Sequence, residues 1–136
     1  MERYILAHDI GTSGTKAVLF DTQTLCVTGD CTESYPTFYP QEGFAEHNPE
    51  QWWEAVCTAT KKLLEQTKVK AEQIAAISFS AIMNTCLPVD KNGKPLCNAV
   101  IWADQRGAEQ LNKLYSAADE NTFYTTTGHR INGTYS

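Results

Sequence analysis

The feature that most constrains this fold is a glycine-containing polar segment between two short apolar runs near the N-terminus. The segment reads Asp9-Ile10-Gly11-Thr12-Ser13-Gly14-Thr15-Lys16 and lies between Tyr4–Ala7 and Ala17–Phe20. The runs are too short for helices and contain Ile, Val and Phe, which predicts two strands joined by a tight turn. Glycine suits such a turn because it adopts unusual backbone angles and lets a ligand approach the main chain closely.

The side chains of this turn suit phosphate binding. Hydroxyls of Thr12 and Ser13, with exposed amides, donate to phosphate oxygens, and Lys16 adds a positive charge. Asp9 at the strand end can hold a hydrated Mg²⁺, which prefers a few carboxylates together with phosphates. The alternative is an ordinary hairpin with glycine for geometry and hydroxyl residues for solubility, and the Gly-Thr-Ser-Gly motif alone favours that alternative.

The segment after the glycines distinguishes two phosphate-binding designs. In Walker and dinucleotide-binding loops, the glycines open a helix whose N-terminus meets the phosphate. Here the next segment ends within a few residues at Asp21–Thr24, and the Walker spacing Gly-x-x-x-x-Gly-Lys is absent. The sequence therefore predicts a phosphate-holding hairpin and not a loop capped by a helix.

Composition narrows the class of protein. The 136 residues suit one domain, and a hydrophobic fraction of 42% is enough for a packed core. A net charge of −5 without a basic stripe argues against binding to nucleic acid or to anionic membranes. Five cysteines without Cys-x-x-Cys spacing argue against zinc and predict reduced, mostly buried thiols.

The sequences at the two ends of the chain predict where the protein resides and whether the chain is a fragment. The N-terminus runs directly into a predicted strand without a leader pattern, and no stretch is apolar enough for a membrane span, so a cytoplasmic protein is expected. The C-terminus stops without a closing helix or strand, which suggests a piece of a longer protein. The oligomeric state is open, with a homodimer as one alternative.

The element pattern predicts a mixed α/β fold. Strands are expected near 3–9, 15–21 and 25–33, then a loop over 34–47, a buried parallel strand at 74–80, a turn at 91–94 and a strand at 98–102. Asn48 is expected to cap a helix that ends near 65–67, with Trp52 and Trp53 as core anchors. Asp104 is expected to cap a second helix. Polar residues cluster at strand ends, where open α/β sheets bind ligands, so the hairpin and residues 80–85 are expected to share a cleft.

Five motifs in this order resemble the FGGY carbohydrate kinases. They are Asp9–Lys16, Glu46–Trp53, Asp90–Pro95, Ile101–Arg106 and Thr127-Gly128, and together they cover essentially the whole chain. The resemblance implies an α/β fold of the actin-like, ribonuclease-H-like class, with 1–136 as an incomplete N-terminal domain. It also implies transfer of the γ-phosphoryl group of ATP to a sugar or polyol hydroxyl with Mg²⁺, and a small-molecule sugar as partner.

The resemblance also implies roles for individual residues. Asp9 resembles the catalytic aspartate near Mg²⁺, and the phosphate-hairpin positions are Thr12, Ser13, Gly14 and Lys16. Met83 and Asn84 match a substrate-contacting pair that is Met-His in xylulose kinases and Arg-Glu in glycerol kinases. Trp102 and Asp104 match the wall of the sugar pocket, and Thr134 falls near a further substrate contact.

Departures from the family pattern affect the expected acceptor substrate and the expected activity of the fragment. Asn84 cannot titrate, Met83 argues against glycerol, and the Trp-Ala-Asp-x-Arg run favours xylulose- or gluconate-type acceptors, so a pentulose, hexulose or aldonate is expected. The general base and the adenosine site of the family lie beyond residue 136, so the fragment alone is expected to be nearly inactive. Two rival readings are an actin-like ATPase and a non-catalytic sugar- or nucleotide-binding module. For Asp104, a helix cap and a sugar contact are equal alternatives, and Arg106 is predicted to be a structural ion-pair partner.

Overall fold

The computed structural model describes residues 3–117 and 119–132, which divide into two compact units. The first unit contains the residues up to Thr37 together with Asn48–Ile82. The second contains Phe38–His47 and the residues from Met83 onward. Within the described residues, every helix is too short or too polar to cross a lipid bilayer.

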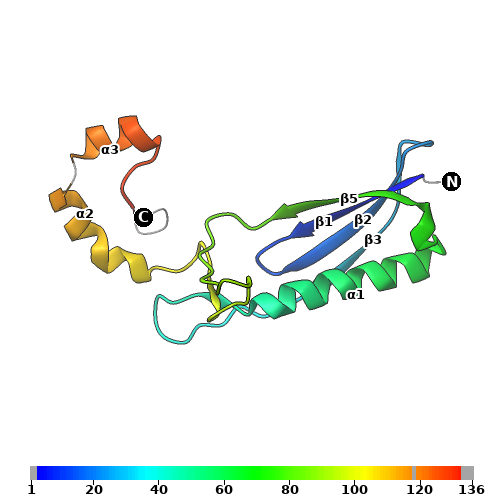
Figure 1. Ribbon diagram of the computed structural model, residues 1–136, viewed down its shortest axis with the longest axis horizontal. Coiled ribbons are helices and arrows are strands. Elements are labelled where there is room, and N and C mark those ends of the chain that lie inside the picture. The colour runs from blue at the N-terminus through cyan, green and yellow to red at the C-terminus, as the bar shows by residue number, and fades with distance from the viewer. Residues whose placement is uncertain (1–2, 118, 133–136) are drawn as a thin grey trace. The chain divides into compact units, whose positions relative to one another are not determined.

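A mixed four-stranded sheet forms the first unit (Figure 1). Its strands are β1 (Tyr4–Ile10), β2 (Gly14–Asp21), β3 (Cys26–Ser34) and β5 (Ile74–Ala81), in the order β3-β2-β1-β5. The first three strands are antiparallel neighbours, and β5 runs parallel to β1. The predicted strands and the mixed α/β class are confirmed. A strand, not a helix, follows the glycine segment.

Helix α1 (Pro49–Thr67) joins the meander to β5 through the short helix η1 (Ala71–Gln73). As predicted, Asn48 caps this helix: its side-chain oxygen accepts a hydrogen bond of 3.0 Å from the Glu50 amide. Pro49 is the first helical residue. Lys68 ends the helix in a left-handed conformation with φ of 58°. The local sequence therefore sets both ends of this helix.

The core of the first unit lies between the sheet and α1, which runs along one sheet face (Figure 1). Its buried members are Leu6, Ala17, Leu19, Ala59, Leu63 and Val69. The prediction that both tryptophans anchor this core is wrong for Trp53, whose side chain is 63% exposed. At 100° per residue Trp53 lies beyond the edge of the stripe formed by Ala55, Val56, Ala59 and Leu63.

Two predictions of burial are wrong in this structure. Strand β5 runs parallel to β1 as expected, but it is mostly exposed, with Ile77 at 58% and Phe79 at 55%. The reason is its place at the sheet edge, since α1 packs mainly on β2 and β3. The cysteines are free as expected, yet three are exposed and two half-buried: Cys26, Cys86, Cys97, Cys31 and Cys57.

The second unit has little regular strand. Strands β4 (Glu46–His47) and β6 (Ala99–Val100) form a short antiparallel pair, so the strand predicted at 98–102 is real but only two residues long. The predicted turn at 91–94 is confirmed, with Gly93 at φ of 79° and a hydrogen bond from the Asp90 amide to the Lys94 carbonyl. Three helical segments follow: η2 (Arg106–Gln110), α2 (Leu111–Ala117) and α3 (Glu120–Thr127).

Candidate functional site

Asp9 and Lys16 face each other across the first hairpin. They are register partners in the β1–β2 pair, and Asp9 is also the register partner of Ser80 in β5. Side chains at such partner positions emerge on the same sheet face. A carboxylate, an ammonium group and a hydroxyl therefore lie in one row at the end of three adjacent strands.

This row borders a depression on the sheet face opposite α1. Its volume is about 240 Å³, and its lining includes Ala7, Asp9, Lys16, Ser78 and Ser80. Asp9 and Lys16 are exposed, so solvent and solutes reach both groups. The expectation that the hairpin and residues 80–85 share a cleft is confirmed for Ser80, while residues 83–85 belong to the second unit.

Close packing explains one glycine of the turn. The Gly11 amide donates to the Gly14 carbonyl at 2.9 Å, which closes the turn between β1 and β2. A Cβ placed on Gly14 would lie 2.5 Å from the main-chain oxygen of Glu33 in β3. Neither turn glycine has positive φ, so the expected need for unusual backbone angles is wrong, and close approach of β3 is the reason for Gly14.

Lys16 is paired with a carboxylate from the neighbouring strand. Its ammonium nitrogen lies 3.2 Å from Oδ2 of Asp30 in β3, and both side chains are 52% exposed. An exposed pair of this kind is weak, because water and salt screen it and two long side chains must be held in place. The ammonium group therefore remains available to an anion in the depression.

His8 is a buried polar residue next to Asp9 that points to the α1 side of the sheet. Its side chain is 3% exposed, its ring stacks on Phe79 at 5.3 Å, and Nε2 lies 3.2 Å from the Thr60 hydroxyl oxygen. Burial lowers the pKa of His8 below its ordinary value, so the ring stays neutral at pH 7. This packing gives His8 a structural role, and the alternation of inward and outward side chains along β1 is consistent with its burial.

The second unit is tied together by one arginine. Arg106 donates to both oxygens of Asp104 at 2.8 Å, and also to Glu46 at 2.7 Å. Its guanidinium carbon lies 3.9 Å from the centre of the Phe44 ring. The hydrogen bonds from Arg106 and then Asn98 lower the pKa of Glu46. Arg106 thus joins residues sixty positions apart, which confirms its prediction as a structural ion-pair partner.

Asp104 is 5% exposed, and both of its carboxylate oxygens accept hydrogen bonds from nearby groups of the same unit. Its Oδ2 accepts from the Ala45 amide at 2.7 Å, and its Oδ1 accepts from the Arg106 amide at 2.9 Å. Burial alone would raise the pKa of Asp104, but hydrogen bonds from Arg106 and from the Ala45 amide outweigh it and lower this pKa. The prediction of a helix cap is wrong, because η2 begins at Arg106 with Gln105 at its cap position.

The other predicted acceptor residues lie in the same unit and are accessible. Met83 is 77% exposed, Trp102 is 48% exposed, and Asn84 is exposed with a left-handed φ of 53°. Asn tolerates this conformation better than most residues, because its short side chain can bond to its own main chain. The predicted residue Thr134 lies outside the described residues.

The predicted site residues thus fall into two groups. Asp9, Thr12, Ser13, Gly14 and Lys16 belong to the first unit. Met83, Asn84, Trp102 and Asp104 belong to the second unit. Across residues 3–117 and 119–132, no three His, Cys, Asp or Glu side chains gather into a metal cluster.

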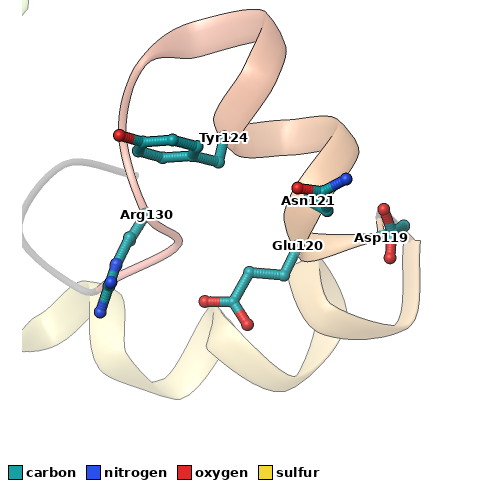
Figure 2. Close-up of a pocket in the computed structure, with 5 residues that line it drawn as sticks. All are labelled: Asp119, Glu120, Asn121, Tyr124 and Arg130. Atoms are coloured by element: carbon teal, nitrogen blue, oxygen red, sulfur yellow. The ribbon is translucent and has the colours of Figure 1, made fainter.

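A separate open depression lies beside α3 and contains none of the predicted site residues. Figure 2 shows Glu120, Tyr124 and Arg130 around the same space, with Asn121 and Asp119 at its margin. The charges are of both signs, and Asp119 is already used as the cap of α3 through a hydrogen bond of 2.8 Å from the Thr122 amide. Asp119 is therefore accounted for by the local structure of α3.

Comparisons with known proteins identify the family. Residues 4–136 match the N-terminal domain of the FGGY family of carbohydrate kinases. A glycerol kinase from Thermococcus gammatolerans is 40% identical over 114 residues, which is 84% of this chain and 23% of that protein.

Solved structures agree in fold. A ligand-bound xylulose kinase from Lactobacillus acidophilus has a TM-score of 0.78 at 28% identity, over 90% of this chain and 24% of that one. A gluconate kinase from the same organism has a TM-score of 0.75 at 26% identity, over 90% and 24%. The chain therefore spans about a quarter of the length of these relatives. The predicted actin-like fold class is confirmed, and the chain belongs to the FGGY family of carbohydrate kinases.

Proposed function

We propose that this chain is the first part of the N-terminal domain of a kinase that transfers the γ-phosphoryl group of ATP to a hydroxyl of a sugar or polyol. The observation that carries the proposal is the row of Asp9 and Lys16 beside the Gly11–Gly14 turn. A carboxylate, an ammonium group and turn amides at one strand end suit a metal-bound polyphosphate. Membership of the family supports the reaction class.

In this proposal the hairpin holds the phosphates of ATP. Main-chain amides of the turn and the hydroxyls of Thr12 and Ser13 donate to phosphate oxygens, and Gly14 keeps the turn close to β3. Lys16 gives up its weak pair with Asp30 and supplies a charge. When bound, Mg²⁺ would neutralise developing charge on the phosphates, and Asp9 is the residue that would hold it.

We place the acceptor beside the second group of residues. Met83 offers an apolar contact, and Asn84 offers an amide that both donates to and accepts from hydroxyls. Trp102 would present a ring face to the carbon skeleton of the sugar. Asp104 already accepts hydrogen bonds on both oxygens, so its part at this wall is to hold the segment that carries Trp102. A pentulose, hexulose or aldonate fits the Met-Asn pair.

Glycerol is a second candidate acceptor, and one observation favours it. The relative that is 40% identical is a glycerol kinase, while the structural neighbours at 26–28% identity are xylulose and gluconate kinases. Met83 cannot donate hydrogen bonds to a small triol as an arginine would. The acceptor panel should therefore include glycerol beside ketoses, polyols and aldonates.

The experiment measures ADP release from MgATP by the complete protein with each acceptor in turn. We expect release only with the correct acceptor, in the cytoplasmic pH range. Release that does not depend on an acceptor favours an actin-like ATPase. MgATP binding without turnover on any member of the panel favours a binding module.

Two variants test the hairpin. Asp9→Asn removes the metal-holding charge, and we expect kcat to fall by about a hundredfold or more. Lys16→Ala removes the phosphate-facing charge, and we expect about a tenfold to hundredfold loss of kcat/KM. Lys91→Ala, at an exposed turn position of the second unit, is the matched control and should leave both constants unchanged. Equal effects of Lys16→Ala and Lys91→Ala would contradict the role of Lys16.

A further inference from the structure

We propose that Tyr35, a residue beyond the family's phosphate motif, is a positioning residue that holds the Gly11–Gly14 turn in its phosphate-binding shape. The inference rests on the proposed function of that turn. The inference starts from the side chain and the main chain of Tyr35, which contact two different carbonyl groups of the turn. The hydroxyl group donates to the Gly11 carbonyl at 2.5 Å, and the Tyr35 amide donates to the Ser13 carbonyl at 3.3 Å.

These two contacts fix the direction of two peptide groups. In a trans peptide the carbonyl and the following N–H point in opposite directions. Drawing the Gly11 and Ser13 carbonyls toward Tyr35 therefore turns the amides of Thr12 and Gly14 the other way. Phosphate binding by a turn depends on such amides sharing one direction, so Tyr35 orients the donors before a nucleotide arrives.

The position of Tyr35 is itself well determined. Its side chain is 8% exposed and borders a depression with Gln51 and Ala55 of α1. Burial raises the pKa of the Tyr35 phenol, so the group remains protonated and acts as a donor at pH 7. Tyr35 follows directly after Ser34, which ends β3, and β3 approaches Gly14 closely. The end of β3 thus contacts the turn at Gly11, Ser13 and Gly14.

The test compares Tyr35→Phe with Tyr39→Phe in the complete protein. The first variant removes only the hydroxyl group, and the second makes the same change on a side chain that is 72% exposed. Calorimetry gives the Kd for MgATP, and steady-state kinetics give KM for MgATP and for the acceptor. We expect Tyr35→Phe to raise Kd and KM for MgATP by about threefold to tenfold, the range for one lost hydrogen bond.

A general loss of structure would change other constants as well. We therefore expect KM for the acceptor to stay within error in Tyr35→Phe, and amide hydrogen exchange to accelerate at residues 12–14 but not in α1. Tyr39→Phe should match the parent protein in every measurement. If Tyr35→Phe has the Kd for MgATP and the exchange rates of the parent protein, the inference is overturned. If the parent protein binds MgATP but phosphorylates no acceptor, the proposed function fails and the effect of Tyr35 on Kd still stands.

Discussion

Replacing Gly14 by alanine tests how closely β3 packs on the phosphate hairpin. The new Cβ would lie 2.5 Å from the Glu33 oxygen and 3.0 Å from the Ser34 Cα. Carbon and oxygen atoms in adjacent strands approach to about 3.3 Å, so the strands must separate by roughly 0.8 Å. Both contacted atoms belong to the main chain, so no side-chain rotation relieves the clash. The first ladder position of the β2–β3 pair, Gly14 with Ser34, must open.

The cost follows from this separation. Overpacking of a close contact destabilises by about 1–3 kcal/mol, and one or two stretched ladder bonds add about 1 kcal/mol each. Alanine also restricts the unfolded chain, which offsets about 0.4–1 kcal/mol. Gly11→Ala carries the same offset without the clash, because its Cβ would lie 3.4 Å from the Gly14 oxygen. The two variants should therefore differ by about 2–5 kcal/mol in local stability, because the offset is common to both.

Native-state hydrogen exchange in the complete protein measures this difference at the amides of β2 and β3. Gly14→Ala should exchange about 30- to 5,000-fold faster than Gly11→Ala there, because each 1.36 kcal/mol is a factor of ten. Its Kd for MgATP should rise as well, since the turn shifts with the strand. Equal protection of β2 and β3 in the two variants would refute the packing argument.

Three further substitutions test the roles of Arg106, His8 and Asp30. In Arg106→Lys, the lysine cannot bond to both carboxylates that Arg106 bridges, so the second unit should be destabilised by about 1–2 kcal/mol. Urea unfolding of the complete protein measures this loss, and an unchanged midpoint would contradict the bridge. Burial lowers the folded-state pKa of His8, so its contribution to the free energy of unfolding is full above the unfolded pKa near 6.5 and is lost as the pH falls through the folded pKa. His8→Gln should therefore flatten the loss of stability between about pH 7 and 5. The same slope of stability against pH in the variant and the parent protein would contradict this role of His8. Asp30→Asn should free Lys16 and lower KM for MgATP by about twofold to fivefold at low salt, with no difference at high salt; an equal KM at low salt would count against competition for Lys16.

Local chemistry made much of the first unit predictable. Short apolar runs bounded by turn residues predicted β1, β2 and β3 to within a residue, and Asn48 marked the start of α1. The short apolar run after the glycines indicated a strand rather than a helix. Each of these features depends on contacts between residues close in the sequence, which a linear pattern records.

Burial and long-range polar contacts were not predictable in this way. The apolar composition of β5 indicates a covered strand, whereas its exposure depends on where α1 packs. Aspartate is a residue type typical of helix caps, which is why a cap was expected at Asp104. Its carboxylate instead accepts a hydrogen bond from the amide of Ala45, which lies fifty-nine positions earlier in the sequence. The role of Tyr35 likewise depends on β3 ending beside a turn that lies more than twenty residues earlier.

The exposed edge of β5 has a practical consequence for work with the isolated polypeptide. Among residues 3–117 and 119–132, only β1 pairs with β5. The other side of β5 therefore presents a row of main-chain donors and acceptors without a neighbouring strand, next to Ile77 and Phe79. Such a border can recruit a strand from another molecule and lead to self-association. Recombinant preparations limited to these 136 residues should therefore be handled as material prone to precipitate, and a charged substitution along that border is a direct way to keep them dispersed.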